Sequence, residues 1–298
     1  MKYKGRGCKV MEKVVVVGGS GFVGSHVADC LSDNGYQVII FDYINSPWLR
    51  ADQNMVIGDI LDTDKLEQTI KGAKFVYNFA ALADLNQALD KPIETATINI
   101  LGNLNVLEAC RIHKVERFVY ASTVYVYSRE GSFYKCSKQS SEQYVEEYQK
   151  VYDLDYTIMR YGSLYGPRAD DTNGIYRIVK LALETGKVEY KGNIESMREY
   201  IHVGDAARAS ISILDQAFKN ESIIVTGQEP MRVFDLLKML AEILDIPEDS
   251  VEFVEEPYNA HYIRTPYAYQ PKLGRKYIPP THVDLGQGLL QIIGEIDN

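Results

Sequence analysis

The sequence lacks the features that mark several specialised classes of protein. Its four cysteines are scattered without a Cys-x-x-Cys pair, so we expect neither a metal site nor a disulfide framework. The longest early apolar run, residues 14–17, is far too short for a signal peptide or a membrane span. Positive charge is in deficit, with a net charge of −9, which argues against non-specific binding to nucleic acid or anionic membranes. We therefore expect a cytoplasmic protein that holds any anionic ligand through helix N-termini and single arginines.

What the first half does contain is a regular alternation of short β-branched runs and stretches with helical spacing. Continuous apolar strands separated by helices are typical of a parallel sheet that is covered on both faces. The predicted fold class is therefore α/β, with a Rossmann-type doubly wound parallel sheet. The expected strands are 14–17, 38–41, 55–57, 74–80, 117–122 and 155–160, and the expected helices between them are 22–34, 63–71 and 93–113.

The pattern loosens after about residue 165, which suggests a second, smaller domain. Helices are expected near 174–185, 205–217, 231–244 and 284–294, with a short strand at 222–226. Residues 1–10 are predicted to be an N-terminal appendage, because Met11, Glu12 and Lys13 directly precede the first strand. We assign 11–165 to a nucleotide-binding domain that also carries the catalytic residues. Residues 166–298 are assigned mainly to a partly interleaved C-terminal α/β domain that binds substrate.

A glycine-rich turn follows the first strand. Gly18, Gly21 and Gly24 let the backbone turn tightly and approach a pyrophosphate at the helix N-terminus. A glycine pattern alone fits any tight turn, but here a strand precedes it, a helix follows it and Asp42 ends the second strand. Asp42 is placed to bind ribose hydroxyls and would repel a 2′-phosphate, so the sequence favours NAD over NADP.

A second pattern combines Thr123 with Tyr134 and Lys138. The tyrosine and lysine are four residues apart, so on a helix they share one face. A nearby ammonium and a positive nicotinamide ring would lower the pKa of the phenol, which could then accept a hydroxyl proton while hydride leaves. An isolated Tyr-x-x-x-Lys is more often a solvated helix face. The strand ending in Thr123 and the nucleotide turn reverse that preference.

These motifs together resemble the extended short-chain dehydrogenase/reductase family, in its NAD-dependent epimerase/dehydratase branch that acts on nucleotide sugars. The resemblance runs from Glu12 to about residue 294. It is carried by GGSGFVGSH, GDILD, NFAALAD, NILGNLNVLEAC, RYGSLYGPR and MREYIHVGDAARA.

The resemblance implies a role for each matching residue. Thr123, Tyr134 and Lys138 would be catalytic, with Lys138 also contacting the nicotinamide ribose, and Asn99 would be structural. Cofactor contacts would come from Gly18, Gly21, Phe22, Val23, Gly24, Asp42, Asp59, Ile60, Ala80, Ala81, Tyr134 and Lys138. Substrate contacts would come from Thr123, Ser163, Arg198 and Arg264.

Some of these roles have structural alternatives. Arg198, matched to the arginine that grips the substrate diphosphate, could instead form an interface salt bridge. Arg264 could be a surface arginine, and His202 is interpreted as structural. The tyrosine-rich segment 258–269 could pack or line the substrate cleft.

Three departures from the family pattern narrow the expected activity. Thr123 is followed by Val124 and Tyr125 rather than the acid pair of 4,6-dehydratases, so elimination lacks its proton carriers. Ser163 stands where an asparagine is common. The segment 124–133 is short, which could open the sugar pocket or leave its closure to another subunit.

The expected function is NAD-dependent oxidation of a ring hydroxyl, at C4, of a nucleotide-diphosphate sugar. We favour an epimerase, on family frequency alone. The close alternative is a 4-dehydrogenase that releases the keto product of a hexose or of an unusual sugar such as an activated heptose. A non-catalytic NAD-binding sensor is the alternative from another class. By analogy the protein would be a homodimer, paired through 93–113 and the helix of Tyr134.

Overall fold

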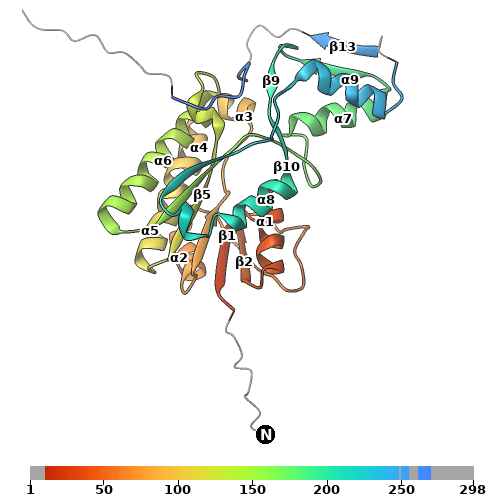
Figure 1. Ribbon diagram of the computed structural model, residues 1–298. Coiled ribbons are helices and arrows are strands. Elements are labelled where there is room, and N and C mark those ends of the chain that lie inside the picture. Colours follow the sequence, from red (N-terminus) through yellow and green to blue (C-terminus); the bar gives the residue numbers. More distant parts are fainter. Residues whose placement is uncertain (1–10, 248–249, 255–260, 270–298) are drawn as a thin grey trace, which may run out of the picture.

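The structure is a computed structural model that describes residues 11–247, 250–254 and 261–269 (Figure 1). The predicted appendage at 1–10 and the expected helix at 284–294 lie outside the described residues. The strands are β1 (Lys13–Val17), β2 (Gln37–Asp42), β3 (Asn54–Ile57), β4 (Phe75–Asn78), β5 (Arg117–Thr123), β6 (Tyr156–Tyr161), β7 (Ser163–Tyr165), β8 (Val188–Lys191), β9 (Met197–Arg198), β10 (Tyr200–His202), β11 (Glu221–Val225), β12 (Met231–Arg232) and β13 (Val251–Val254). The helices are α1 (Phe22–Asp33), α2 (Thr63–Ile70), α3 (Leu85–Asp90), α4 (Pro92–Ala96), α5 (Asn103–Ile112), α6 (Ser132–Tyr152), α7 (Gly174–Thr185), α8 (Val203–Ser212) and α9 (Val233–Ile243).

One parallel sheet organises the larger part of the molecule. Its strand order is β11-β6-β5-β4-β1-β2-β3, with every neighbouring pair parallel. From β1 the chain adds strands on one side, β2 and β3, and then on the other, starting with β4. Doubly wound sheets bind ligands at such a switch point, beyond the carboxyl ends of their strands. The predicted doubly wound fold is confirmed.

The apolar run of β1 explains why helices cover both faces of this sheet. Successive side chains of a strand point to opposite faces, so a continuous apolar run needs a core on each side. Val14 and Val16 pack in one core, with residues of α1 and α8, whereas Val15 and Val17 pack in the other, with residues of α2, α5 and α6. Figure 1 shows these two helical layers.

The second half of the chain contributes to both parts of the molecule. Helix α8 and strand β11 complete the layers of the large sheet, while α7, α9, β8 and β13 build a smaller core of their own. The boundary near residue 165 remains a prediction. The helix expected at 205–217 ends at Ser212 and is followed by a 3₁₀ turn, η3 (Gln216–Phe218).

Two negative findings concern the described residues alone. No helix among them is both long and apolar enough to cross a membrane. Within the same ranges, no group of three or more His, Cys, Asp or Glu side chains could hold a metal ion.

Candidate active site

The glycine turn between β1 and α1 is shaped for close backbone approach. Gly18 has φ +77, and a Cβ added there would lie 2.4 Å from the backbone nitrogen of Ala80. A Cβ on Gly24 would lie 2.3 Å from the carbonyl oxygen of Gly18. Helix α1 begins at Phe22, and its N-cap Gly21 offers no side-chain cap to the first backbone amides. The turn therefore fits the pyrophosphate of a dinucleotide, because uncapped amides at a helix N-terminus bind anions.

Asp42 lies beside this turn, at the end of β2. One carboxylate oxygen accepts the amide of Ser20 at 2.9 Å and the other accepts the amide of Ile44 at 3.3 Å. A carboxylate has about four lone-pair sites, so acceptor capacity remains for a ribose hydroxyl. Among the described residues no lysine or arginine forms an ion pair with Asp42, which fits NAD better than NADP.

The other predicted cofactor residues are placed around the same edge of the sheet. Asp59 is exposed and its Oδ1 accepts the amide of Leu61 at 2.9 Å, while Ile60 is buried against Gly102. Ala80 and Ala81 are half-buried just after β4.

Thr123, Tyr134 and Lys138 meet at the carboxyl end of β5. Thr123 is the last residue of that strand, and the other two lie in the first two turns of α6. The Thr123 hydroxyl lies close enough to the phenol of Tyr134 to influence its pKa. The Lys138 ammonium donates to the carbonyl oxygen of Ala121 at 2.7 Å, and its Nζ lies 5.8 Å from the centre of the Tyr134 ring. The structure therefore brings together the three predicted catalytic residues.

Burial dominates the protonation of this group. Burial raises the pKa of Tyr134 to about 12, opposed by the nearby hydroxyl of Thr123. Burial lowers the pKa of Lys138 to about 7, opposed by the charge of Glu142. In the protein without cofactor, desolvation of the phenolate therefore dominates the pKa of Tyr134, and its lowering by the ammonium and the nicotinamide ring together stays a prediction.

Asn99 links helix α6 to the segment just before α3 through hydrogen bonds. It lies in a π-helical turn, η1 (Thr97–Gly102), between α4 and α5. Its amide nitrogen donates to Ser137 Oγ at 2.9 Å and to the carbonyl oxygen of Leu82 at 3.0 Å, and its Oδ1 accepts the Leu82 amide at 2.7 Å. Since Ser137 directly precedes Lys138, these bonds hold in place the turn of α6 that carries Lys138.

A buried ion pair, which the sequence reasoning missed, lies one helical turn beyond Lys138. Glu142 and Arg160 are joined at 2.7 Å, with side chains only 2% and 9% exposed. Glu142 also accepts a hydrogen bond from Ser122, the neighbour of Thr123, at 2.5 Å. The i, i+4 spacing of Lys138 and Glu142 could have shown that Glu142 shares a helix face with the lysine. Nothing in the sequence indicated that Arg160, on β6, would pair with it.

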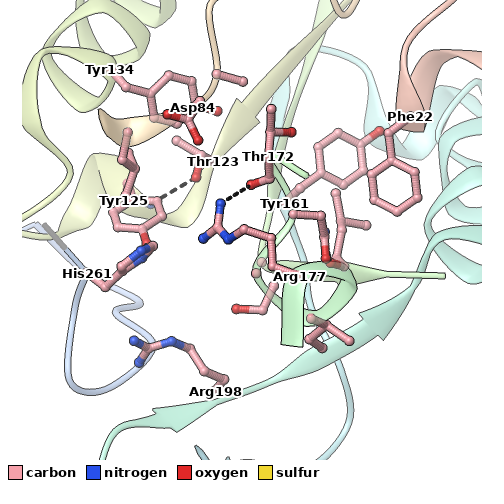
Figure 2. Close-up of a pocket in the computed structure, with 18 of the residues that line it drawn as sticks. Phe22, Asp84, Thr123, Tyr125, Tyr134, Tyr161, Thr172, Arg177, Arg198 and His261 are labelled. Atoms are coloured by element: carbon pink, nitrogen blue, oxygen red, sulfur yellow. Dashed lines mark hydrogen bonds between the residues drawn. The ribbon is translucent and has the colours of Figure 1, made fainter. Parts of the chain in front are cut away.

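One cavity of about 900 Å³ connects the turn with the predicted catalytic and substrate residues. Figure 2 shows Thr123, Tyr134 and Arg198 around this cavity, with Phe22 entering from the cofactor side. Of the predicted site residues, those that line it are Phe22, Val23, Gly24, Ala81, Thr123, Tyr134, Lys138, Ser163 and Arg198. Arg264 is exposed and lines a separate hollow of about 350 Å³, so the structure does not bring it together with the others.

Arg198 faces the cavity from β9. It is 7% exposed, and its guanidinium lies 4.5 Å from the centre of the Tyr262 ring. Among the described residues it donates hydrogen bonds only to the carbonyl oxygens of Met197 and Ile263, at 3.2 and 3.4 Å. No carboxylate among the described residues pairs with it, so the interface salt bridge is not found there. Ser163 Oγ lies 3.3 Å from the Tyr262 hydroxyl.

Two residues of the segment 261–269, His261 and Tyr262, line the cavity next to the short segment 124–133. That segment begins with a 3₁₀ turn, η2 (Val124–Tyr127). The Tyr125 hydroxyl lies 2.6 Å from His261 Nδ1, and its ring lies 4.7 Å from that of Tyr262. Burial, reinforced by the charges of Arg198 and Arg177, lowers the pKa of His261 to about 4. Within the described residues, the segment 261–269 therefore contributes a histidine and a tyrosine to the cavity beside Tyr125.

Three comparisons with known proteins agree with this geometry. The model of the NAD-dependent epimerase/dehydratase family matches residues 14–227. A putative UDP-glucose 4-epimerase of Methanocaldococcus jannaschii is 30% identical over 249 residues, covering 76% of this chain and 81% of that protein. The crystal structure of a UDP-glucose 4-epimerase of Thermotoga maritima with UDP-glucose has a TM-score of 0.78 at 28% identity, covering 86% of this chain and 90% of that one. A UDP-glucose 4-epimerase of Thermus thermophilus in complex with NAD has a TM-score of 0.77 at 25% identity, covering 88% and 95%.

Proposed function

This chain belongs to the NAD-dependent epimerase/dehydratase family, and from that premise we propose that it oxidises the C4 hydroxyl of a nucleotide-diphosphate sugar and epimerises that carbon. The observation that supports this most is the meeting of Thr123, Tyr134 and Lys138 in a cavity that also reaches the glycine turn. The three side chains that would handle the proton all line this cavity.

In this proposal the glycine turn and Asp42 hold the two ends of the adenosine diphosphate half of NAD. The other cofactor contacts would come from Phe22, Val23, Asp59, Ile60, Ala80 and Ala81. Bound NAD supplies the hydride acceptor and a positive charge near the reacting carbon. That charge supplements Lys138 in lowering the pKa of Tyr134 from about 12, so that the phenol oxygen can accept the hydroxyl proton.

Thr123 and Lys138 position this proton transfer. The Thr123 hydroxyl and the Tyr134 phenol line the same cavity and would share the reacting oxygen of the sugar. Lys138 is held by the carbonyl oxygen of Ala121 and would contact the nicotinamide ribose. Returning the proton from Tyr134 and the hydride to the opposite face of the keto sugar completes the epimerisation.

Substrate binding in this proposal depends on Arg198. Its buried guanidinium has no carboxylate partner in the described part of the chain, so a diphosphate would supply the missing counter-charge. Ser163 would contact the substrate through its hydroxyl, which the Tyr262 hydroxyl holds in place. Arg264, predicted as a further ligand, has the weaker support because it lines a different hollow.

A 4-dehydrogenase that releases the keto sugar is the second candidate. The same three residues would serve it, and the difference is whether the keto sugar leaves before hydride returns. The relatives named above favour the epimerase. Elimination by a 4,6-dehydratase is disfavoured because the residue after Thr123 is Val124, which is 1% exposed. A valine side chain has no ionisable group that could donate or accept a proton.

The test is turnover of a panel of UDP-, dTDP- and GDP-sugars, with product sugars identified by NMR and NADH followed by its absorbance. A 4-epimer without net NADH supports the epimerase, and a keto sugar with stoichiometric NADH supports the dehydrogenase. Y134F is expected to lower either activity by about 10²-fold or more. The matched control is Y144F, which changes a tyrosine that is 42% exposed on the same helix. Unchanged turnover in Y134F contradicts the catalytic assignment, and no reaction across the panel favours the NAD-binding sensor.

The homodimer and the cytoplasmic location also remain proposals. The helices expected to pair expose apolar side chains, among them Leu101, Ile112 and Val151, each at least 44% exposed. Light scattering during size-exclusion chromatography tests the dimer: a monomeric mass at micromolar concentration contradicts it.

A further inference from the structure

The charged side chains that line the cavity differ in whether they already have hydrogen-bond or ion-pair partners. Asp84 caps α3 by accepting the Gln87 amide at 2.8 Å, and Asp170 accepts the amide and hydroxyl of Thr172 at 2.9 and 2.5 Å. Glu189 and Lys191 pair with each other at 3.5 Å. The acidic groups of this cavity thus have donors already, and one of its cations has its own carboxylate.

Two arginines of the cavity, apart from the catalytic lysine, pair with no carboxylate among the described residues. Arg198 comes from β9 and Arg177 from the first turn of α7. Arg177 is exposed, and among the described residues it donates only from Nη1, to the carbonyl oxygens of Asp171 and Thr172 at 2.9 and 3.4 Å. Within the described ranges its Nε and Nη2 donors therefore remain available to a ligand.

The two guanidinium groups approach the cavity from different sides. In Figure 2 the guanidinium of Arg177 points toward Thr123 and Tyr125, whereas Arg198 enters from β9 below. Both charges act on His261, which contacts Tyr125, so they share one electrostatic environment. Two guanidinium groups that lack a carboxylate partner among the described residues give this cavity two places where anionic groups of a ligand could bind.

We propose that Arg177 binds a carboxylate on the sugar itself, so that the preferred substrate is a nucleotide-linked hexuronic acid rather than a neutral hexose. This inference rests on the proposed function, in which Arg198 holds the diphosphate. Arg177 lies on the Thr123 side, where the sugar must sit for its C4 hydroxyl to reach Tyr134. A planar guanidinium with two free donors matches a carboxylate in the bidentate manner, which an ammonium cannot reproduce.

The experiment compares UDP-glucuronate with UDP-glucose, which differ only at C6, in the wild-type protein, R177Q and R177K. K180Q is the matched control, because Lys180 is a cation of the same helix that pairs with Asp171 and does not line the cavity. We expect the wild type to prefer the uronate. R177Q should lower kcat/KM for UDP-glucuronate by roughly 10- to 100-fold, the usual effect of losing hydrogen bonds to a charged group, with little change for UDP-glucose. R177K should recover only part of this loss, and K180Q should behave as wild type.

Binding of glucuronate 1-phosphate and glucose 1-phosphate, measured by calorimetry with NAD present, repeats the comparison without a nucleotide base. A preference for the uronate that disappears in R177Q supports the inference even if neither UDP-sugar is turned over, in which case only the proposed function fails. Equal losses on both sugars would assign Arg177 to the diphosphate and overturn the inference. Turnover of UDP-glucose without any preference or dependence on Arg177 also overturns it, while leaving the proposed function intact.

Discussion

Replacing Lys138 by methionine (K138M) is expected to abolish turnover and, at neutral pH, to stabilise the fold. The ammonium is 3% exposed, and burial lowers its pKa from 10.5 to about 7. Methionine has similar length and no charge, so it fills the same space without the desolvation cost. In the proposed mechanism, Lys138 therefore lowers the stability of the folded protein and is retained for its role in turnover.

The magnitude follows from the pKa difference. A shift of roughly 3.5 units corresponds to about 5 kcal/mol at 1.36 kcal/mol per unit, which is an upper limit for the gain in K138M. Loss of the hydrogen bond to Ala121 removes about 1 kcal/mol, and incomplete desolvation removes more, so we expect a gain of about 3 kcal/mol at pH 7.

The gain should depend on pH in a defined direction. Between pH 7 and 10.5 the unfolded chain still carries the lysine proton that the folded protein has lost, so wild-type stability rises with pH in this window. K138M lacks that group, and its advantage should therefore shrink by about 3 kcal/mol between pH 7 and ~9.5. Urea unfolding followed by circular dichroism at several pH values measures this, with K150M, which removes a 64% exposed lysine from the same helix, as control. An advantage that stays constant with pH, or a destabilised K138M at pH 7, would refute the reasoning.

Three further predictions concern other parts of the site. Y134F should lower kcat by about 10²-fold or more while NAD still binds, as measured by turnover and by cofactor titration, and a loss below tenfold would contradict its role as proton acceptor. G18A should prevent NAD binding and destabilise the fold, because its Cβ would meet backbone at 2.4 Å; G174A, whose Cβ meets nothing within 4 Å, is the control, and equal NAD affinity in both would contradict the account. E142Q should lose about 3–5 kcal/mol of stability by leaving Arg160 buried and unpaired, which chemical denaturation measures, and a loss below 1 kcal/mol would show that the pair is not needed.

The fold could be predicted from the sequence because its signals are local. The apolar run at 14–17 required a two-sided core, and the glycine turn between strand and helix fixed where the nucleotide end lies. Family membership, the doubly wound sheet and NAD as cofactor are confirmed by the family model and the solved structures. The individual contacts assigned to cofactor and substrate remain predictions.

The features that the sequence did not reveal depend on contacts between distant segments. Glu142 meets Arg160 across two elements, and Tyr125 meets His261, 136 residues away. Arg264 was chosen from a loose motif match, whereas Arg177 carries no motif and enters the cavity only because α7 folds over it. The raised pKa of Tyr134 was equally hidden, because burial of a side chain is a property of the packed site.

The most direct test of the central claim follows the hydrogen on C4. The sugar nucleotide that the protein turns over is prepared with deuterium at C4 and incubated with protein and NAD in ordinary water. The account predicts that the deuterium returns to C4 of the epimer, or appears on NADH if the keto sugar is released. Loss of the deuterium to solvent, or its retention in the starting sugar while another carbon reacts, would contradict oxidation at C4 by Tyr134 and its partners.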